Sequence, residues 1–131
     1  MKSIYKYYQP NEKDIKDEYG DCVIRALTKV LEKAWLDVFD ELVPIAREIQ
    51  TTINNKPVYE ECLRREGFTY IGVSNKKGSK RPTIEEFAKQ HKTGTYFCSV
   101  ANHVVAVVDG CYYDTWNSGY KSMYGYWEKE V

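Results

Sequence analysis

The chain has 131 residues, which is enough for one domain with its own apolar core. Lys plus Arg and Asp plus Glu are equal at 19 each, so no excess of charge points to nucleic acid or to an anionic membrane. Residues 1–14 lack the apolar run of a signal peptide, and no later segment is apolar for the length of a membrane span. We therefore expect a single cytoplasmic domain over residues 1–131.

The four cysteines, Cys22, Cys62, Cys98 and Cys111, are widely spaced in the sequence. Without an export signal, such cysteines are typical of reduced thiols rather than of a disulfide framework. No Cys/His cluster has the spacing of a zinc site, so the sequence predicts no metal.

The first element begins at Asp21-Cys22. Residues 1–20 are predicted to be an irregular lead-in, and apolar residues then recur at helical spacing to about Lys33. Asp21 is the expected N-cap, its carboxylate accepting hydrogen bonds from the free N–H groups of the first turn. Cys22 would lie in that turn, where the same N–H groups and the helix dipole lower a cysteine pKa. The alternative is that Cys22 is a small buried apolar residue.

Three further helices are expected before residue 94. The second should start near Trp35 and be kinked or split by Pro44, which removes a backbone donor. The third should begin at Pro57 and end at Gly67. The fourth opens with the capping-box pattern Thr83-Ile-Glu-Glu86.

The rest of the chain has the alternation of strands. One strand is expected at residues 68–73, before a basic loop at 74–82, and four more at 95–100, 103–108, 111–116 and about 124–128. A helical part at about 20–92 followed by a small antiparallel sheet at about 94–128 is an α+β fold.

The most informative element is the hairpin around Asp109-Gly110. This dipeptide favours a two-residue turn of the primed type, which fixes the register of the flanking strands. His103 and Asp114 then lie on one sheet face as diagonal neighbours, about 7–8 Å apart between backbones. A carboxylate holds a neighbouring imidazole in one tautomer, and an imidazole that also meets Cys22 can take the thiol proton.

Each of these residues also has a purely structural interpretation. His103 can be a hydrogen-bonded residue at a strand start, and Asp114 can cap the turn that follows it. Taken together, a cysteine at a helix start, a histidine on a strand and an aspartate one hairpin later predict a catalytic triad.

This order of residues resembles the papain-like cysteine peptidases, and especially small phage and Gram-positive bacterial members akin to the bacteriocin-leader-processing peptidase domains. In those, an Asp-Cys pair opens the central helix, as Asp21-Cys22 does here, and a hairpin carries the other two residues. Asp114-Thr115-Trp116 is similar to the Asn-Ser-Trp stretch of papain relatives. Residues 103–119 look like a group of uncharacterised short phage and bacterial proteins. The resemblance covers residues 20–35 and 94–128.

The resemblance implies a papain-like fold with the nucleophile on the central helix, and a peptide or protein substrate. Cys22 would be the nucleophile, His103 the general base and acid, and Asp114 the group that orients the ring. Supporting roles would fall to neighbours of the triad, namely Asp21, Trp116 and Asn117. Of these, the Trp116 ring is expected to shield the His–Asp pair from water. This chemistry needs no metal or organic cofactor.

The family usually places a glutamine about six residues before the cysteine, where its amide helps to bind the oxyanion. Here that position is Lys16, whereas Gln9 and Asn11 lie further upstream. The backbone N–H of Cys22 is one expected oxyanion donor, and the sequence does not identify the second.

The sequence thus predicts a cysteine peptidase, or a related amide or thioester hydrolase, with a Cys-His-Asp triad. The alternative is a papain-like binding module with weak or no catalysis, such as a phage protein that acts on a host factor; the missing glutamine favours it. A third class, nucleic-acid binding through the basic residues at 76–81, is disfavoured by the zero net charge. The oligomeric state stays open.

Overall fold

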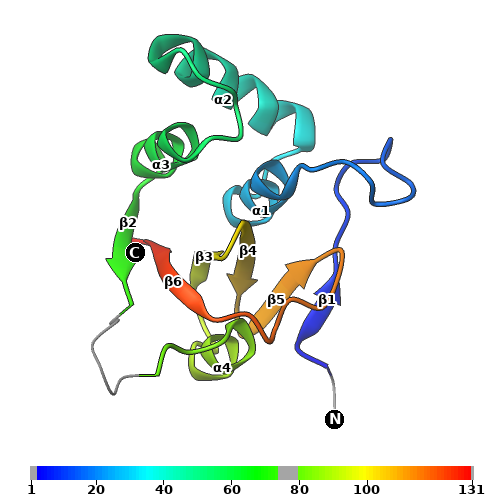
Figure 1. The fold of residues 1–131 in the computed structure, drawn as a ribbon, viewed down its shortest axis with the longest axis vertical. Helices are drawn as coiled ribbons and strands as arrows, with labels where there is room; N and C mark the ends of the chain where they lie inside the picture. Colours follow the sequence, from blue (N-terminus) through cyan, green and yellow to red (C-terminus); the bar gives the residue numbers. More distant parts are fainter. Residues whose placement is uncertain (1–2, 74–79, 131) are drawn as a thin grey trace.

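The protein is described by a computed structural model covering residues 3–73 and 80–130. Within these residues the chain is α+β, with four helices and one mixed sheet of six strands (Figure 1). Most of the basic loop expected at 74–82 lies outside the described residues. No helix in the described part is both long and apolar enough to cross a membrane.

The helices lie close to where the apolar periodicity puts them, at α1 (Cys22–Leu31), α2 (Trp35–Ile49), α3 (Lys56–Arg65) and α4 (Ile84–Gln90). The expected capping box of α4 is confirmed, because the Glu86 N–H donates to Thr83 Oγ1 at 3.2 Å and the Thr83 N–H donates to Glu86 Oε1 at 2.9 Å. Of the two effects predicted for Pro44, a kink or a split, the split is wrong, since α2 runs through Pro44 as one element. Burial of its apolar face at Val38, Leu42 and Ile45 holds the helix together across the missing donor.

The strands are β1 (Tyr5–Tyr7), β2 (Phe68–Gly72), β3 (Thr95–Val100), β4 (His103–Val108), β5 (Cys111–Asp114) and β6 (Met123–Lys129). Their order across the sheet is β1-β5-β4-β3-β6-β2. The central strands therefore come from the last third of the chain. The two edges are formed by strands from earlier parts.

Strand β1 corrects two predictions at once. It lies in the segment expected to be irregular, and it pairs with β5 in parallel, so the sheet is mixed rather than purely antiparallel. The pairing is reinforced by the rings of Tyr5 and Tyr112, whose centroids are 5.6 Å apart. The parallel partner of β1 lies more than a hundred residues further along the chain, and no local turn connects the two strands. Sequence periodicity therefore does not reveal this pairing.

The β4–β5 hairpin has the predicted turn and register. Asp109 and Gly110 have φ values of 48° and 81°, as a primed turn requires, and Val108 faces Cys111. Strand β5 ends at Asp114, two residues earlier than expected.

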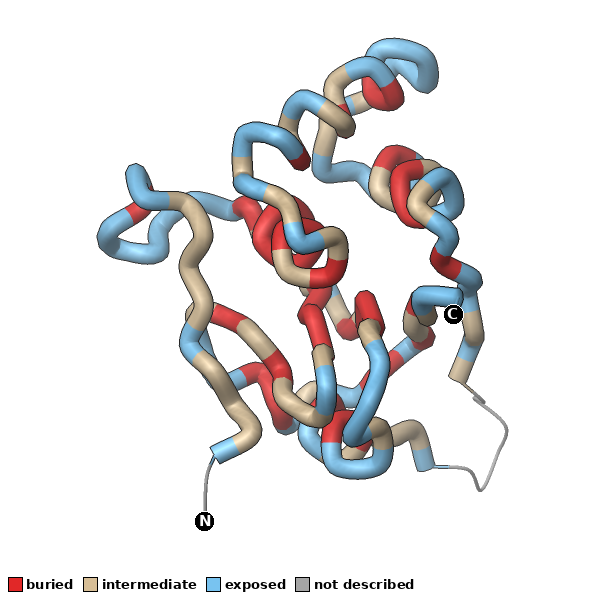
Figure 2. The backbone as a smooth tube through the Cα atoms, turned by 180° about the vertical axis from the view of Figure 1, so that it is seen from behind, coloured by how far each residue is buried: buried red, intermediate tan, exposed pale blue. Residues whose placement is uncertain are grey.

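Apolar residues are buried on both faces of the sheet. One core joins the helices α1, α2 and α3 to strand residues such as Phe97, Val104 and Ala106. The other core joins α4 to strand residues whose side chains point to the opposite face of the sheet, such as Cys98, Val105 and Val107. Figure 2 shows buried positions concentrated in α1 and in the strands beside it. Helix α1 is therefore fixed against the sheet, with its first residue near the start of β4 (Figure 1).

Candidate active site

Cys22 is the first residue of α1, but Asp21 does not cap this helix as predicted. The Asp21 carboxylate instead accepts hydrogen bonds from Arg25, one turn later at 3.2 Å, and from the Trp35 indole N–H at 2.9 Å. A buried guanidinium is a stronger partner for a carboxylate than a backbone N–H, which explains the difference. The first-turn N–H groups beside Cys22 are consequently not occupied by the Asp21 side chain.

His103 and Asp114 are joined by a short hydrogen bond, with His103 Nε2 and Asp114 Oδ2 2.6 Å apart. His103 is the first residue of β4 and Asp114 the last residue of β5, as the hairpin register requires. Only 9% of the His103 side chain and 1% of the Asp114 side chain are exposed. The pair is therefore largely withdrawn from water.

The Cys22 thiol lies against the same imidazole. Burial raises the pKa of this thiol, but a hydrogen bond with His103, the charge of His103 and a backbone hydrogen bond from Val104 outweigh burial and lower it. Because His103 Nε2 is bound to Asp114, Nδ1 is the ring nitrogen left for the interaction with the thiol. Cys22, His103 and Asp114 thus form one connected row.

The imidazole is correspondingly easy to protonate. Burial lowers the pKa of His103, whereas the hydrogen bonds and charges of Asp114 and Cys22 raise it, with a net result of about 9. A thiol with a lowered pKa beside an imidazole with a raised pKa favours the thiolate–imidazolium pair over the neutral thiol and imidazole.

Asp114 is held ionised by a full set of donors. Its carboxylate accepts from His103 and Ser118 at 2.6 Å each, from the Thr115 N–H at 2.8 Å and from Arg25 at 3.1 Å. Burial raises the pKa of Asp114, but the hydrogen bonds from His103 and Ser118 and the charges of His103 and Arg25 lower it below its usual value. The carboxylate is therefore fixed in position and in charge.

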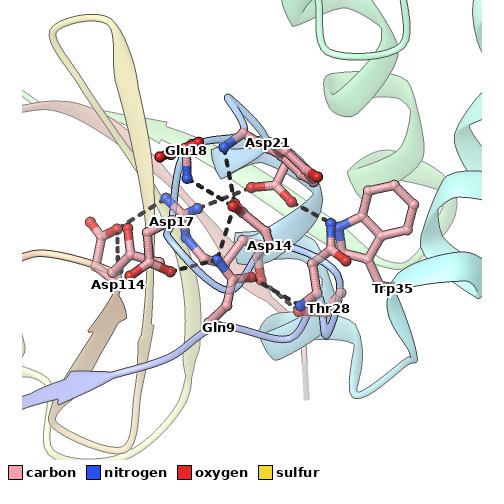
Figure 3. Close-up of polar contacts among 12 residues, drawn as sticks. Gln9, Asp14, Asp17, Glu18, Asp21, Thr28, Trp35 and Asp114 are labelled. Carbon is pink, nitrogen blue, oxygen red and sulfur yellow. Dashed lines mark hydrogen bonds and ion pairs between the residues drawn. The ribbon is translucent and has the colours of Figure 1, made fainter.

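Arg25 and Ser118 are site residues that the sequence analysis missed. Arg25 is buried and bridges the carboxylates of Asp21 and Asp114, so a polar row runs from Trp35 to Asp114 (Figure 3). The hydrogen bond between Asp114 and His103 extends this row to the imidazole. The four-residue spacing of Asp21 and Arg25 on a helix was an available signal for this contact. The sequence contains no comparable signal for Ser118, because the position of Ser118 depends on the turn after β5.

The two remaining predicted residues behave differently from each other. The Trp116 ring lies 5.0 Å from the His103 ring, between centroids, and 39% of Trp116 is exposed. The structure therefore places the indole beside the imidazole, and its shielding role stays a prediction. Asn117 instead accepts from the Tyr112 hydroxyl at 2.6 Å and from the Gly119 N–H at 3.1 Å, which makes it part of the turn rather than of the site.

The upstream amide of Gln9 is engaged away from the cysteine. The Gln9 amide donates to Asp17 at 2.9 Å and to Asp14 at 3.4 Å, within the loop that precedes α1 (Figure 3). Asp14 is 2% exposed and organises that loop by accepting the N–H groups of Glu18 and Tyr19. Gln9 is thus a loop residue and does not supply the oxyanion donor of the resembled family.

A cavity of about 460 Å³ opens beside Cys22 and His103. Its helical wall comes from the starts of α1 and α3, and its sheet wall from β2, β3, β4 and β6. Side chains on these walls include Asn55, Tyr59, Asn102 and Trp127. This volume is typical of a pocket that holds a small ligand or part of a larger one.

Among residues 3–73 and 80–130, no three His, Cys, Asp or Glu side chains are grouped to hold a metal ion. The four cysteines are free thiols, with Cys62 and Cys98 buried and Cys22 and Cys111 partly exposed.

Comparison with protein-family models, with curated proteins and with solved structures finds no match for this chain. Its function has to be inferred from the chemistry of the site.

Proposed function

We propose that this protein is a cysteine peptidase, or a related amide or thioester hydrolase, of papain-like architecture. The observation that carries the proposal is the row Cys22–His103–Asp114, with a lowered thiol pKa at one end and a 2.6 Å hydrogen bond at the other. The cavity beside it gives an acyl group access to the sulfur. Polypeptide is the substrate class that the resemblance favours.

The first half of the reaction would use the ion pair directly. The Cys22 thiolate attacks the carbonyl carbon, a C–S bond forms, and the carbonyl electrons move onto oxygen. As the tetrahedral species collapses, the imidazolium of His103 gives its proton to the leaving amine or thiolate. The product is an acyl group on Cys22 and a neutral imidazole.

The second half would reverse the roles. Neutral His103 takes a proton from water, the hydroxide adds to the thioester carbonyl, and Cys22 leaves as thiolate. Asp114 keeps the ring oriented throughout and stabilises its charged form without taking the proton. Trp116 limits the access of water to the ring from its own side.

The proposal is tested by the reactivity of the thiols. Native protein is treated with limiting iodoacetamide at pH 6, and each cysteine is quantified by peptide mapping. Cys22 should alkylate at least tenfold faster than Cys111, which is also partly exposed, because only a thiolate reacts. His103→Ala should slow Cys22 strongly. His91→Ala is the matched control, since the His91 ring stacks on Phe87, 3.8 Å away between centroids.

Equal rates for Cys22 and Cys111 would remove the hydrolase proposal. A second function, binding without turnover, is favoured by one observation, the engagement of the Gln9 amide in its own loop. An activated ester separates the two functions. A burst of p-nitrophenolate followed by steady release means hydrolysis, whereas a burst alone means a site that acylates without turning over.

A further inference from the structure

We propose that the hydroxyl of Tyr59 is the second oxyanion donor of this site, doing with a phenol what the resembled family does with a glutamine amide. The inference rests on the function proposed above and names a residue for a step that function requires. The first donor would be the backbone N–H of Cys22 at the start of α1.

Tyr59 lines the same cavity as the nucleophile, and the charge of Cys22 acts on its hydroxyl. It lies on α3, in the helical wall of this 460 Å³ space, which His103 also lines. Its ring packs on Phe97, with centroids 5.3 Å apart and the planes tilted by 41°. Because Phe97 is fully buried in the sheet, this contact restricts the position of the Tyr59 ring.

The Tyr59 hydroxyl has a proton to give. Among residues 3–73 and 80–130, no hydrogen bond joins the Tyr59 hydroxyl to the protein, although its ring is half-buried. Burial first, and then the charges of Glu60 and Cys22, raise the pKa of Tyr59 to about 12. The group therefore stays a neutral donor at every pH at which the thiolate reacts.

The competing donors on the cavity wall are less suitable. The Asn55 amide already donates to the Thr51 hydroxyl. Asn54 and Asn102 lie on the exposed rim, where no packing fixes the amide. Oxyanion stabilisation depends on donors that are in place before charge develops, so a ring anchored on Phe97 has the advantage.

In the attack of Cys22 on the substrate carbonyl, the negative charge develops on the carbonyl oxygen. When the Cys22 sulfur bonds to the carbonyl carbon, the π pair of the C=O bond moves to oxygen. That oxygen then accepts hydrogen bonds from the Cys22 N–H and the Tyr59 O–H. On collapse the pair returns, the bond to the leaving group breaks, and the Tyr59 proton stays on Tyr59.

The test compares two reactions of the same sulfur. Acetylation of Cys22 by p-nitrophenyl acetate passes through an oxyanion, whereas alkylation by iodoacetamide displaces iodide at a saturated carbon and forms none there. At pH 7 the acetylation rate constant is measured from the p-nitrophenolate burst, corrected with Cys22→Ala, and the alkylation rate constant from peptide mapping of Cys22. The quantity of interest is the acetylation rate divided by the alkylation rate.

Tyr59→Phe keeps the ring on Phe97 and removes only the hydroxyl. We expect the ratio to fall at least tenfold, with the alkylation rate unchanged within about twofold. Tyr126→Phe is the control, because Tyr126 is half-buried on the other face of the sheet and outside the cavity lining, and its ratio should stay constant.

An unchanged ratio in Tyr59→Phe overturns the assignment, and so does a comparable fall in Asn102→Ala with none in Tyr59→Phe. Failure of the proposed function has a different signature. In that case Cys22 in the unmodified chain reacts no faster than Cys111 with either reagent.

Discussion

Arg25 places a positive charge between two buried carboxylates. Its guanidinium is 3.2 Å from Asp21 and 3.1 Å from Asp114, and its side chain is 7% exposed. A buried ion pair often contributes little net stability, but removal of one partner is costly because the other charge remains desolvated. Here removal of Arg25 would leave two such charges, one of them in contact with His103.

Arg25→Met should therefore lower the free energy of unfolding by about 3–5 kcal/mol, measured by urea denaturation at pH 7. The matched control is Arg65→Met. Arg65 also pairs with two carboxylates, those of Glu61 and Glu48, but its side chain is 49% exposed. Exposed pairs contribute about 0–1 kcal/mol. Equal losses in the two variants would mean that the buried position of Arg25 does not matter.

At the scale of the elements, α3 and α4 differ in how their first turns are closed. Thr83 caps α4 with its hydroxyl, whereas Asn55 occupies the same position before α3 without a side-chain capping bond. Thr83→Ala should cost about 1 kcal/mol in unfolding free energy, because the Glu86 N–H loses the hydroxyl that accepts from it. Asn55→Ala should cost clearly less. A larger loss in Asn55→Ala would show that cap geometry is not what stabilises these helix starts.

The elements that could be predicted from sequence are those whose cause is local. The α4 capping box and the Asp109-Gly110 turn depend only on residues that are adjacent in the sequence, and both predictions are confirmed. The hairpin register predicted that His103 and Asp114 are neighbours, and in the structure a hydrogen bond of 2.6 Å joins them. Strand β1 and the contacts of Arg25 depend on partners far along the chain. Asp21 was assigned to the nearest donors, whereas a buried cation one turn later attracts it more strongly.

At the scale of the whole molecule, the thiolate–imidazolium pair affects stability against pH. The pKa of His103 is raised from 6.5 to about 9, so its contribution to stability is complete below pH 6.5 and is lost as the pH rises through 9. The pKa of Cys22 is lowered from 9.0, so its contribution is present above pH 9 and is lost as the pH falls through the folded value. In the pH range where both contributions change, their slopes of unfolding free energy against pH cancel. The reason is that the folded ion pair holds as many protons as the neutral thiol and imidazole of the unfolded chain.

Cys22→Ala removes one side of this balance. Asp114 still raises the pKa of His103 in that variant, by less than in the parent because Cys22 no longer contributes, so its unfolding free energy should fall as the pH rises from 6.5 through that folded pKa. The slope relative to the parent protein should approach about 1.4 kcal/mol per pH unit. Urea denaturation at four pH values measures it, and the double variant Cys22→Ala with His103→Gln should lose the slope. Parallel profiles for Cys22→Ala and the parent would show that no ion pair forms.

The pairing of β1 with β5 also bears on how the protein is made. A ribosome releases β1 and the Cys22 helix first, and the strands carrying His103 and Asp114 only after about eighty more residues. Through most of translation β1 has no partner strand, and the thiol has no imidazole to take its proton. Parallel pairing across so long a separation forms late, because the closure entropy of the intervening chain must first be overcome. A nascent chain would therefore carry an unreactive cysteine until its sheet is nearly complete, which keeps a nucleophile from meeting other newly made polypeptides.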